Sequence, residues 1–466
     1  MSNAQPHGAG TGAGAGFTGP DETSREGKKV LHRAIGASAM GNATEWFDYG
    51  VYAVAATYIT ANFFPGEGAM GTVWTLATFA LSFLVRPLGG LFWGPLGDRI
   101  GRKRVLALTI ILMAGSTFAI GLLPTHSMAG WVAPALLILL RMLQGFSTGG
   151  EYGGAATFMA EYAPDKKRGF YGSFLEFGTL GGFALGSLIV LLCSLILGND
   201  AMTEWGWRLP FLIAGPMGII GMYLRNKLED TPVFRELEAS GELEPATSTA
   251  LKDLIRNYWR PMLIMAGLVI PLNLVNYTLL TYMPTYLEGT VGMDANTVLT
   301  LMFVGQFAMM LMIPLAGARS DKIGRKPMWF FSLTGLFVLA IPMYMIMAKG
   351  FWFAMLGFAV LGLLYLPQLA TISATFPAMF PTQVRYAGFA ITYNVSTALF
   401  GGTAPMVNEL LINATGNVLM PAFYMMAACL VGLVAVWKMP ETAGASLRNM
   451  KIPGIKKVHI PRRLEG

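Results

Sequence analysis

Charged residues are scarce in this chain of 466 residues, of which 13% are Asp, Glu, Lys or Arg and 54% are hydrophobic. A soluble domain usually carries about 25% charged residues, so the composition excludes an ordinary soluble protein. Apolar runs of about 20 residues, each enough for one helical span, recur along the chain. Polar and apolar residues do not alternate over strand-length segments, which argues against an outer-membrane barrel. We therefore expect an all-α integral membrane protein that spans a lipid bilayer several times.

Cysteine and histidine are also rare, with two and four copies, and their scarcity excludes several kinds of site. Cys193 and Cys429 fall within apolar runs, so we expect buried thiols and no disulfide. The histidines are not spaced as metal ligands, no Walker loop is present, and no nucleophile is paired with a base. We therefore expect no enzyme activity, no metal, no cofactor and no nucleic-acid partner, and ATP is not the energy source.

Twelve hydrophobic segments follow one another, and we interpret them as transmembrane helices. Their approximate limits are 33–63, 72–96, 104–123, 130–162, 168–195, 207–226, 259–288, 295–318, 327–347, 351–380, 385–413 and 418–438. The first, fourth, seventh, tenth and eleventh segments are longer than one bilayer requires, so we expect some of them to tilt or protrude.

Basic residues concentrate in every second connection between these segments. The loop after the second segment carries Arg99, Arg102 and Lys103, and similar clusters follow the fourth, sixth and eighth segments. The intervening loops are almost free of Lys and Arg. The positive-inside rule therefore predicts that the basic loops and both termini are cytoplasmic, in a multi-pass protein of a bacterial cytoplasmic (inner) membrane.

The polar stretch after the sixth segment divides the chain into two similar halves. The ten residues from Gly94 to Lys103 recur from Gly317 to Lys326, with the Gly, Asp and Gly-Arg-Lys positions preserved. Repeated halves are typical of secondary transporters, whose substrate site lies where the halves meet. We predict a disordered tail over 1–30, six-helix bundles over 31–228 and 259–440, a cytoplasmic central loop over 229–258 and a short basic tail over 441–466.

The repeated loop, G-x-x-x-D-[RK]-x-G-R-[RK], resembles the signature loop of the major facilitator superfamily. Asp98 lies where the third segment begins and can favour the positive end of that helix, and Arg102 can pair with it. The resemblance implies twelve helices in two pseudo-symmetric six-helix bundles that work by alternating access. It also implies a charge cluster that steadies the conformation closed to the cytoplasm. The gating residues predicted in this way are Asp98, Arg99, Arg102, Arg168, Asp321, Arg325 and Arg385.

Further motifs are similar to those of the metabolite:proton symporter branch, and within it to the osmosensory proline/glycine-betaine:proton symporters. They are the stretches 45–52, 86–90, 144–152, 160–169, 173–178, 206–211 and 280–287. The resemblance runs from about Leu31 to Thr442 and implies proton-driven uptake of a zwitterionic osmolyte such as proline, glycine betaine or ectoine. Those symporters carry a long C-terminal coiled coil, whereas residues 443–466 have no sustained heptads, so we expect no osmotic regulation by such a coil.

Six ionisable residues fall within the apolar segments of the first half. They are Glu45, Asp48, Arg86, Arg141, Glu151 and Glu176. Ionisable groups at membrane depth are costly and usually functional. Our hypothesis is that Asp48 carries the proton, helped by Glu45 on the same helix face, with Arg141 as its cationic partner and Glu151 near the face of Arg141. A structural ion pair remains the alternative, and Glu176 is as compatible with pairing to a basic loop as with proton relay.

A zwitterionic substrate needs two kinds of contact. A trimethylammonium group favours aromatic faces, and a carboxylate needs an arginine or amide donors. The predicted substrate residues are Arg86, Trp46, Tyr49, Tyr52, Tyr277, Tyr282, Asn273 and Asn276. For each aromatic residue taken alone, packing or a place in the interfacial belt is the alternative interpretation.

Two rival functions remain open at this point. A proton symporter for an organic acid such as 2-oxoglutarate, citrate or shikimate would need two arginines in the cavity, and Arg86 and Arg141 are available. A transporter-like osmosensor or receptor without turnover is the rival from another class. In every case the partners are a small substrate, protons and the lipid bilayer; the sequence predicts no particular oligomeric state.

Overall fold

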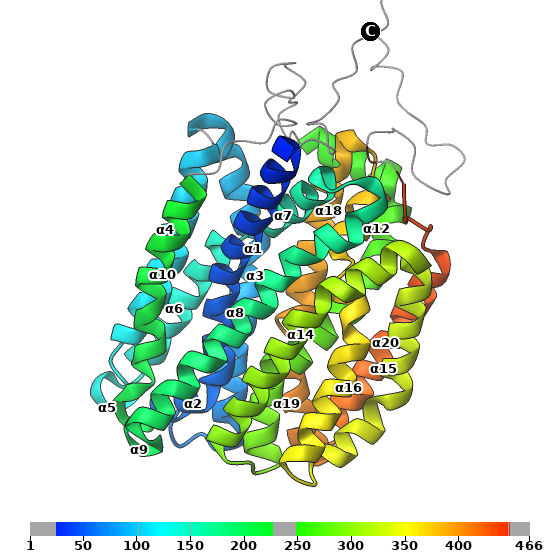
Figure 1. Ribbon diagram of the computed structural model, residues 1–466. Helices are drawn as coiled ribbons and strands as arrows, with labels where there is room; N and C mark the ends of the chain where they lie inside the picture. Colours follow the sequence, from blue (N-terminus) through cyan, green and yellow to red (C-terminus); the bar gives the residue numbers. More distant parts are fainter. Residues whose placement is uncertain (1–24, 101, 150, 227–247, 446, 448–466) are drawn as a thin grey trace, which may run out of the picture.

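The computed structural model describes residues 25–100, 102–149, 151–226, 248–445 and 447 (Figure 1). Secondary structure within these ranges consists of helices only. The predicted N-terminal tail up to residue 24, most of the predicted central loop and residues 448–466 lie outside the described part, so the predicted domain boundaries stay predictions.

The first half contains eight helices of at least eight residues within the described ranges. They are α1 (Arg25–Val54), α2 (Ala56–Phe63), α3 (Ala69–Ile100), α4 (Arg102–Leu122), α6 (Val132–Ser147), α7 (Glu151–Tyr162), α8 (Arg168–Leu197) and α10 (Arg208–Asn226). Short turns connect them: α5 (His126–Ala129), η1 (Asp165–Lys167), α9 (Asn199–Ala201) and η2 (Met202–Gly206).

The second half follows the same plan with more interruptions. Its long helices are α12 (Ser248–Tyr277), α14 (Ala295–Ile323), α15 (Arg325–Met347), α16 (Phe351–Leu369), α18 (Thr382–Ser396), α19 (Ala404–Thr415) and α20 (Met420–Lys438). Between them lie η3 (Thr278–Tyr282), α13 (Met283–Thr285), η4 (Tyr286–Thr290), α17 (Ile372–Thr375), η5 (Pro377–Met379) and η6 (Thr397–Gly401).

Each of the twelve predicted segments coincides with one helix or with consecutive helices, which agrees with the predicted fold class. Eight helical stretches in the described ranges are long and apolar enough to cross a membrane. The five segments that looked too long are broken helices: α1 with α2, α6 with α7, α12 with η3 to η4, α16 with α17, and α18 with η6 and α19. Breaks in helices and π turns often accompany functional sites, so we expect a functional site near these five broken segments.

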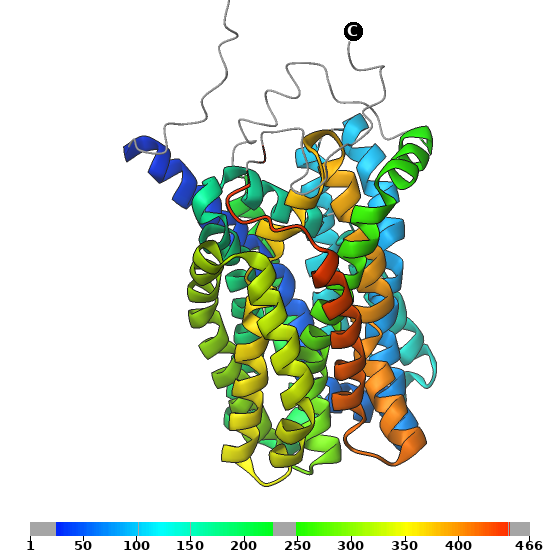
Figure 2. The same ribbon diagram turned by 90° about the vertical axis from the view of Figure 1, so that its right-hand side faces the viewer.

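The two halves meet along two main seams, besides smaller contacts such as that of α7 with α18. On one side α8 and α14 run antiparallel next to each other (Figure 1), with Ser187 hydrogen-bonded to Gln306 at 2.9 Å near the middle of both helices. On the other side α3 lies against η6 and α19, the blue and orange helices of Figure 2. Both described ends of the chain lie at the end of the bundle where α4, α8 and α15 begin (Figure 1).

Close helix packing inside the first half depends on small residues. Gly182 of α8 faces α1, and a Cβ added to it would lie 2.8 Å from the backbone nitrogen of Phe47. Small residues let helix backbones approach within a membrane, where apolar burial itself gives little driving force. The approach fixes α1 against α8, and it thereby sets Trp46 of α1 beside the polar residues of α8.

Candidate functional site

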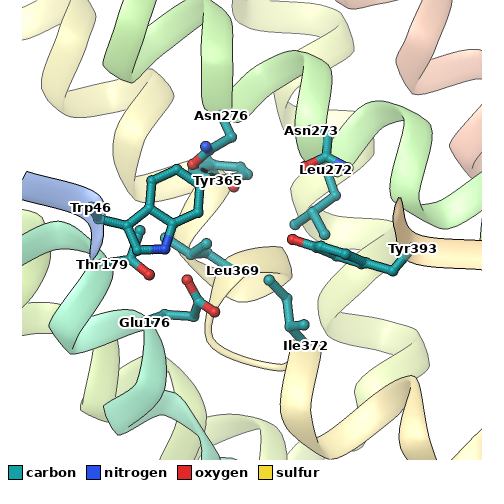
Figure 3. A pocket seen from close by; sticks show the side chains of 10 residues that line it. All are labelled: Trp46, Glu176, Thr179, Leu272, Asn273, Asn276, Tyr365, Leu369, Ile372 and Tyr393. Atoms are coloured by element: carbon teal, nitrogen blue, oxygen red, sulfur yellow. Dashed lines mark hydrogen bonds between the residues drawn. The ribbon is translucent and has the colours of Figure 1, made fainter. Parts of the chain in front are cut away.

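A small pocket lies between the two halves and is lined by side chains of both (Figure 3). The first half lines it with Trp46 of α1 and with Glu176 and Thr179 of α8. The second half contributes residues from α12, α16, α17 and α18, namely Leu272, Asn273, Asn276, Tyr365, Leu369, Ile372 and Tyr393. Five of the six elements that line the pocket, all except α8, belong to the broken segments.

The pocket combines aromatic rings with a few polar groups. Figure 3 shows Trp46, Thr179 and Glu176 on one side and Tyr393 on the other, its hydroxyl directed into the space between them. The indole Nε1 of Trp46 is buried and has no hydrogen-bond partner among the described residues. Such a donor can satisfy a ligand acceptor, because an unpaired buried polar group is otherwise costly.

The amides of the pocket are held in place by neighbouring hydroxyls. Tyr365 donates a hydrogen bond to Oδ1 of Asn276 (3.1 Å), and Nδ2 of Asn273 donates to Thr397 in the π turn η6 (2.8 Å). The amide nitrogen of Asn276 and the amide oxygen of Asn273 are thereby left for another partner. Together the two side chains offer one donor and one acceptor to a ligand.

Glu176 is the only acidic or basic side chain among those that line the pocket. It is 2% exposed, and its Oε1 accepts a hydrogen bond from the hydroxyl of Tyr152 in α7. Tyr152 in turn stacks on Tyr393 of α18, with ring centroids 4.7 Å apart and planes at 17°. This contact joins the first half to the second. The pocket carboxylate is therefore linked by one hydrogen bond, through Tyr152, to the contact between the halves.

A separate chain of polar side chains runs through the interior of the first half. The Oγ1 of Thr117 donates to Asp48 at 2.7 Å, Nε2 of Gln144 donates to Thr117, and Nη1 of Arg141 donates to Oε1 of Gln144 at 2.7 Å. Asp48 and Arg141 are therefore connected through two intermediate side chains, whereas the sequence suggested direct pairing. The guanidinium of Arg141 also lies 4.1 Å from the ring centroid of Tyr52.

Glu45 belongs to a different pair. Its Oε1 lies 4.0 Å from Nη2 of Arg86, and the Arg86 guanidinium lies 4.1 Å from the ring centroid of Phe83 and 4.9 Å from that of Tyr49. Aromatic faces stabilise a buried cation and offset part of its lost hydration. The Nε and Nη2 atoms of both Arg86 and Arg141 have no hydrogen-bond partner among the described residues.

The predicted substrate residues divide into two groups. Trp46, Asn273 and Asn276 line the pocket, whereas its lining does not include Arg86, Tyr49, Tyr52, Tyr277 or Tyr282. Tyr277 packs against Trp46 and Phe83, with ring centroids 6.2 and 5.1 Å away. Tyr52 donates to the backbone oxygen of Thr75 (3.0 Å), and Tyr282 donates to Glu409 (2.8 Å). A substrate role for these residues stays a prediction.

Sequence reasoning did not select four residues of this site: Thr179, Tyr365, Tyr393 and Tyr152. Tyr365 and Tyr393 are visible in the sequence as polar residues in apolar segments, but a helix pattern does not say which face meets the other half. The signal that was available is their position in segments too long for one bilayer span.

Four of the predicted gating residues gather at one end of the bundle, which we call the basic end. Asp321 of α14 accepts hydrogen bonds from the backbone nitrogens of Gly169 (2.8 Å) and Phe170 (2.9 Å) in the first turn of α8, and pairs with Nη2 of Arg325 at 2.6 Å. A carboxylate suits the positive end of a helix. Arg385 of α18 pairs with Glu161 of α7 at 2.9 Å, again between the halves.

The chain after α20 crosses this basic end, and we call its described residues, 440–445 and 447, the C-terminal strap. Glu441 accepts from the backbone nitrogens of Arg325 (2.9 Å) and Lys326 (3.0 Å). Arg168 donates to the backbone oxygen of Ala445, and Arg385 to that of Leu447, both at 2.8 Å. The side chain of Leu447 is buried with Ala160 of α7 and Ala378 of η5. The strap therefore contacts both halves at once.

Four predicted residues cannot be placed in these clusters. The side chains of Asp98, Arg99, Arg102 and Glu151 lie outside the described part of the structure. The gating and proton-coupling roles assigned to them therefore stay predictions from the sequence alone.

A contact between the halves also bridges the opposite end. The hydroxyl of Thr57 in α2 donates to Glu288 in η4 at 2.6 Å. Gly402, just after η6, packs so tightly on Phe83 in the middle of α3 that an added Cβ would lie 2.7 Å from Cδ2 of the ring. The pocket thus lies between two ends that are both bridged by contacts between the halves.

Comparison with known proteins follows the same lines. Residues 39–404 match the family model described as Major Facilitator Superfamily. The chain is 42% identical over 431 residues to the "Glycine betaine/proline/ectoine/pipecolic acid transporter OusA" of Dickeya dadantii, covering 90% of this chain and 85% of the relative. It is 43% identical over 431 residues to the "Proline/betaine transporter" of Escherichia coli K12, again covering 90% of this chain and 85% of the relative. A "Putative proline/betaine transporter" of Staphylococcus haemolyticus is 43% identical over 428 residues, covering 90% of each chain.

Solved structures show the same fold at lower sequence identity. The proton:xylose symporter XylE bound to 6-bromo-6-deoxy-D-glucose superposes with a TM-score of 0.73 at 17% identity, over 91% of this chain and 99% of that one. A partially occluded inward-open form of XylE from E. coli gives 0.69, also at 17% identity, over 90% and 100% of the two chains. Family match, relatives and fold agree: this chain is a multi-pass membrane transporter protein that belongs to the Major Facilitator Superfamily.

Proposed function

We propose that this protein takes up a small zwitterionic osmolyte, such as glycine betaine, proline or ectoine, together with protons. The observation that carries the proposal is the pocket between the halves, which offers aromatic faces, one carboxylate and amide groups. The printed names of the relatives, which include glycine betaine, proline, ectoine and pipecolic acid, support the same substrate class.

The two ends of a zwitterion find different partners in this pocket. The cationic end would lie against the rings of Trp46, Tyr365 and Tyr393, where cation–π attraction contributes roughly 2 kcal/mol when water is excluded. The carboxylate end would accept hydrogen bonds from Nε1 of Trp46 and the amide of Asn276, the donors that the described residues leave free. The pocket is small, so it must widen before such a molecule enters.

Proton coupling is assigned to the polar interior of the first half, with Asp48 as the proton carrier. Asp48 is 4% exposed, and the chain through Thr117 and Gln144 connects it to the charge of Arg141. A change at any member of such a chain alters the hydrogen bonds of the others. Glu45 of α1 and Arg86 of α3 form a second pair and act beside it. The proton gradient supplies the energy, and no cofactor is needed.

Orientation follows from the same charges. The basic end of the bundle would face the cytoplasm of a bacterial cell, in its inner membrane, with both termini on that side. Asp321, Arg325, Arg168, Arg385 and the C-terminal strap would then form the inner gate. The Thr57–Glu288 contact would belong to the outer gate. Rocking of the 31–228 half against the 259–440 half would open them in turn.

An organic-acid symporter is less well supported by the pocket. A dianion needs fixed positive charge, but the lining carries Glu176, and neither Arg86 nor Arg141 belongs to it. An acid in the binding pocket repels a dicarboxylate and attracts an ammonium group. The relatives are named transporters, which favours turnover over a receptor role.

Uptake into proteoliposomes tests the function. With an imposed inward proton gradient, labelled glycine betaine, proline, ectoine and 2-oxoglutarate are compared at low and high osmolality. We expect accumulation of the zwitterions and its loss when the gradient is collapsed. Accumulation of 2-oxoglutarate alone, or no gradient-driven accumulation of any zwitterion, would overturn the proposal.

A further inference from the structure

We propose that Glu176 selects the cationic end of the substrate, and that its bond to Tyr152 ties occupancy of the pocket to the contact between Tyr152 and Tyr393. This inference rests on the proposed function and deepens it, because it names a specificity residue and a route from the pocket to a gate. It uses residues that neither the resemblance nor the printed names of the relatives assign.

Glu176 is a buried carboxylate without a protein cation beside it among the described ion pairs. The carboxylate is 2% exposed, and no arginine or lysine pairs with it among the described ion pairs. Its hydrogen-bond donor is the neutral hydroxyl of Tyr152. A buried carboxylate without a fixed cation needs its positive charge from elsewhere. The ammonium group of a bound substrate supplies it.

Aromatic and aliphatic side chains surround the carboxylate. Trp46, Tyr365 and Tyr393 line the same pocket, so a cation placed against the carboxylate also meets aromatic faces (Figure 3). Leu272, Leu369 and Ile372 complete the wall with apolar groups, which suit methylated or ring-closed ammonium groups. This combination favours a bulky, weakly hydrated cation over a small inorganic one.

Contacts between α7 and α18 connect the pocket to the basic end. Tyr152 opens α7 just after the break between α6 and α7, and its ring stacks on Tyr393 of α18. The next residue, Gly153, packs on Ala390 of α18, where an added Cβ would lie 3.0 Å from the Ala390 Cβ. Farther along the same two helices, Glu161 pairs with Arg385 at 2.9 Å. One seam therefore runs from the pocket carboxylate to the basic end.

Substrate binding acts on this seam through the carboxylate. A cation that draws Glu176 toward the pocket weakens the hydrogen bond that holds the Tyr152 hydroxyl, and Tyr152 is then less restrained against Tyr393. An empty pocket keeps the bond and keeps the basic end closed. Binding energy is in this way used to change the population of two conformations, which a ligand does only if it binds one of them better.

The first experiment measures selectivity by equilibrium binding to purified protein without a proton gradient. Glycine betaine is compared with 3,3-dimethylbutanoate, its isostere in which a neutral carbon replaces the quaternary nitrogen. The variants are Glu176→Gln and, as matched control, Glu409→Gln, since Glu409 also accepts a hydrogen bond from a tyrosine, Tyr282, but does not line the pocket. We expect wild type and the control to prefer betaine by about tenfold or more, and Glu176→Gln to lose that preference.

The outcomes separate the inference from the function it rests on. If wild type binds neither zwitterion nor isostere, the proposed function fails. If wild type prefers betaine and Glu176→Gln keeps the same preference, the function stands and the role of Glu176 is overturned. Loss of preference in Glu409→Gln to the same degree would also overturn it, since the effect would then not be specific to the pocket.

The second experiment measures the coupling. Spin labels are attached to Lys167→Cys and Ile323→Cys, two exposed positions of opposite halves at the basic end, in protein lacking the native cysteines. Betaine should lengthen the distance distribution in wild type. Tyr152→Phe keeps an aromatic ring for stacking but loses the bond to Glu176, so we expect betaine to bind and the difference between empty and loaded distributions to shrink at least about twofold. An unchanged betaine response in Tyr152→Phe would overturn the coupling.

Discussion

The Nη2 atom of Arg86 lies 4.0 Å from Oε1 of Glu45, and both side chains are almost fully buried. This pair separates the two acids of α1, because Asp48, three residues later, is connected instead to Thr117, Gln144 and Arg141. Each acid of α1 therefore has its own arginine, one from α3 and one from α6. The arrangement leads to separate predictions for the two.

Replacing Asp48 tests its role as proton carrier. Asp48→Asn keeps the hydrogen bond from Thr117 but removes the titratable group, so we expect proton-driven accumulation to be lost while substrate exchange across the membrane continues. The measurement compares gradient-driven uptake with counterflow in the same proteoliposomes. Accumulation at the wild-type level would remove Asp48 from the mechanism.

Breaking the Glu45–Arg86 pair tests its structural contribution. Arg86→Ala removes the cation that lies 4.0 Å from the buried Glu45 carboxylate, for which we expect a loss of stability of about 3–5 kcal/mol. Glu45→Gln combined with Arg86→Gln leaves neither charge and should lose less than Arg86→Ala alone. The measurement is thermal unfolding in detergent, analysed as a double-mutant cycle with both single variants. Additive losses would show that the two residues do not interact.

Asp321 at the basic end is predicted to hold the halves together. Asp321→Ala removes the acceptor for Gly169 and Phe170 and the partner of Arg325, bonds worth about 1.5–3 kcal/mol each when charged. We expect the distance distribution of the spin-label pair on residues 167 and 323 to shift toward the open form without substrate. Asp294→Ala is the matched control, because Asp294 caps the other end of the same helix and should cost about 1 kcal/mol of stability without opening the gate.

The C-terminal strap is predicted to reinforce the same closure. Leu447→Asp puts a charge where the leucine packs against Ala160 and Ala378, so the strap should detach and the closed form should lose population. Leu447→Met, which nearly conserves volume, should leave the distribution unchanged. The same labelled pair reports the result, and equal distributions in both variants would mean that the strap carries no closing energy.

Helix packing in the first half gives a prediction about stability. Gly145 of α6 faces the backbone of Ser82 in α3 so closely that a Cβ has no room, whereas Gly115 of α4 has no neighbour within 4 Å. Gly145→Val should therefore lower the yield of folded protein and its unfolding temperature. For the fraction that folds, we expect the free energy of unfolding to fall by about 3 kcal/mol or more. Gly115→Val should be tolerated. Fluorescence-detected size-exclusion chromatography compares the two, and equal profiles would contradict the packing described.

Much of the fold could be predicted because the bilayer imposes simple rules. Spans of about 20 apolar residues, a repeated loop and the asymmetry of basic residues specify helices, halves and an expected orientation. The site was only partly accessible in the same way. Trp46, Asn273 and Asn276 were selected and do line the pocket, but Tyr365 and Tyr393 were not separated from other polar residues of their segments.

Partner choice was the least accessible property. The spacing of residues along one helix indicates which side chains share a face, but it does not say which face meets another helix. For this reason the sequence predicts a direct Asp48–Arg141 pair, whereas the structure connects the two through Thr117 and Gln144. The contact of Arg86 with Glu45 is not predicted by the sequence, and the substrate role of Arg86 stays a prediction. For Glu176 the sequence is compatible both with pairing to a basic loop and with proton relay. The packing of α8 between α1 and α14 places its carboxylate in the pocket.

The sequence by itself determined that this protein is a helical membrane transporter with two related halves, because hydrophobicity and repeats are local properties of the chain. Only the tertiary structure decided which buried charges meet, which aromatic rings line the pocket and how Tyr152 touches Tyr393. Those contacts join residues more than a hundred positions apart in several cases, such as Arg168 with Ala445. They depend on how small residues let particular helices approach, and no single segment contains that information.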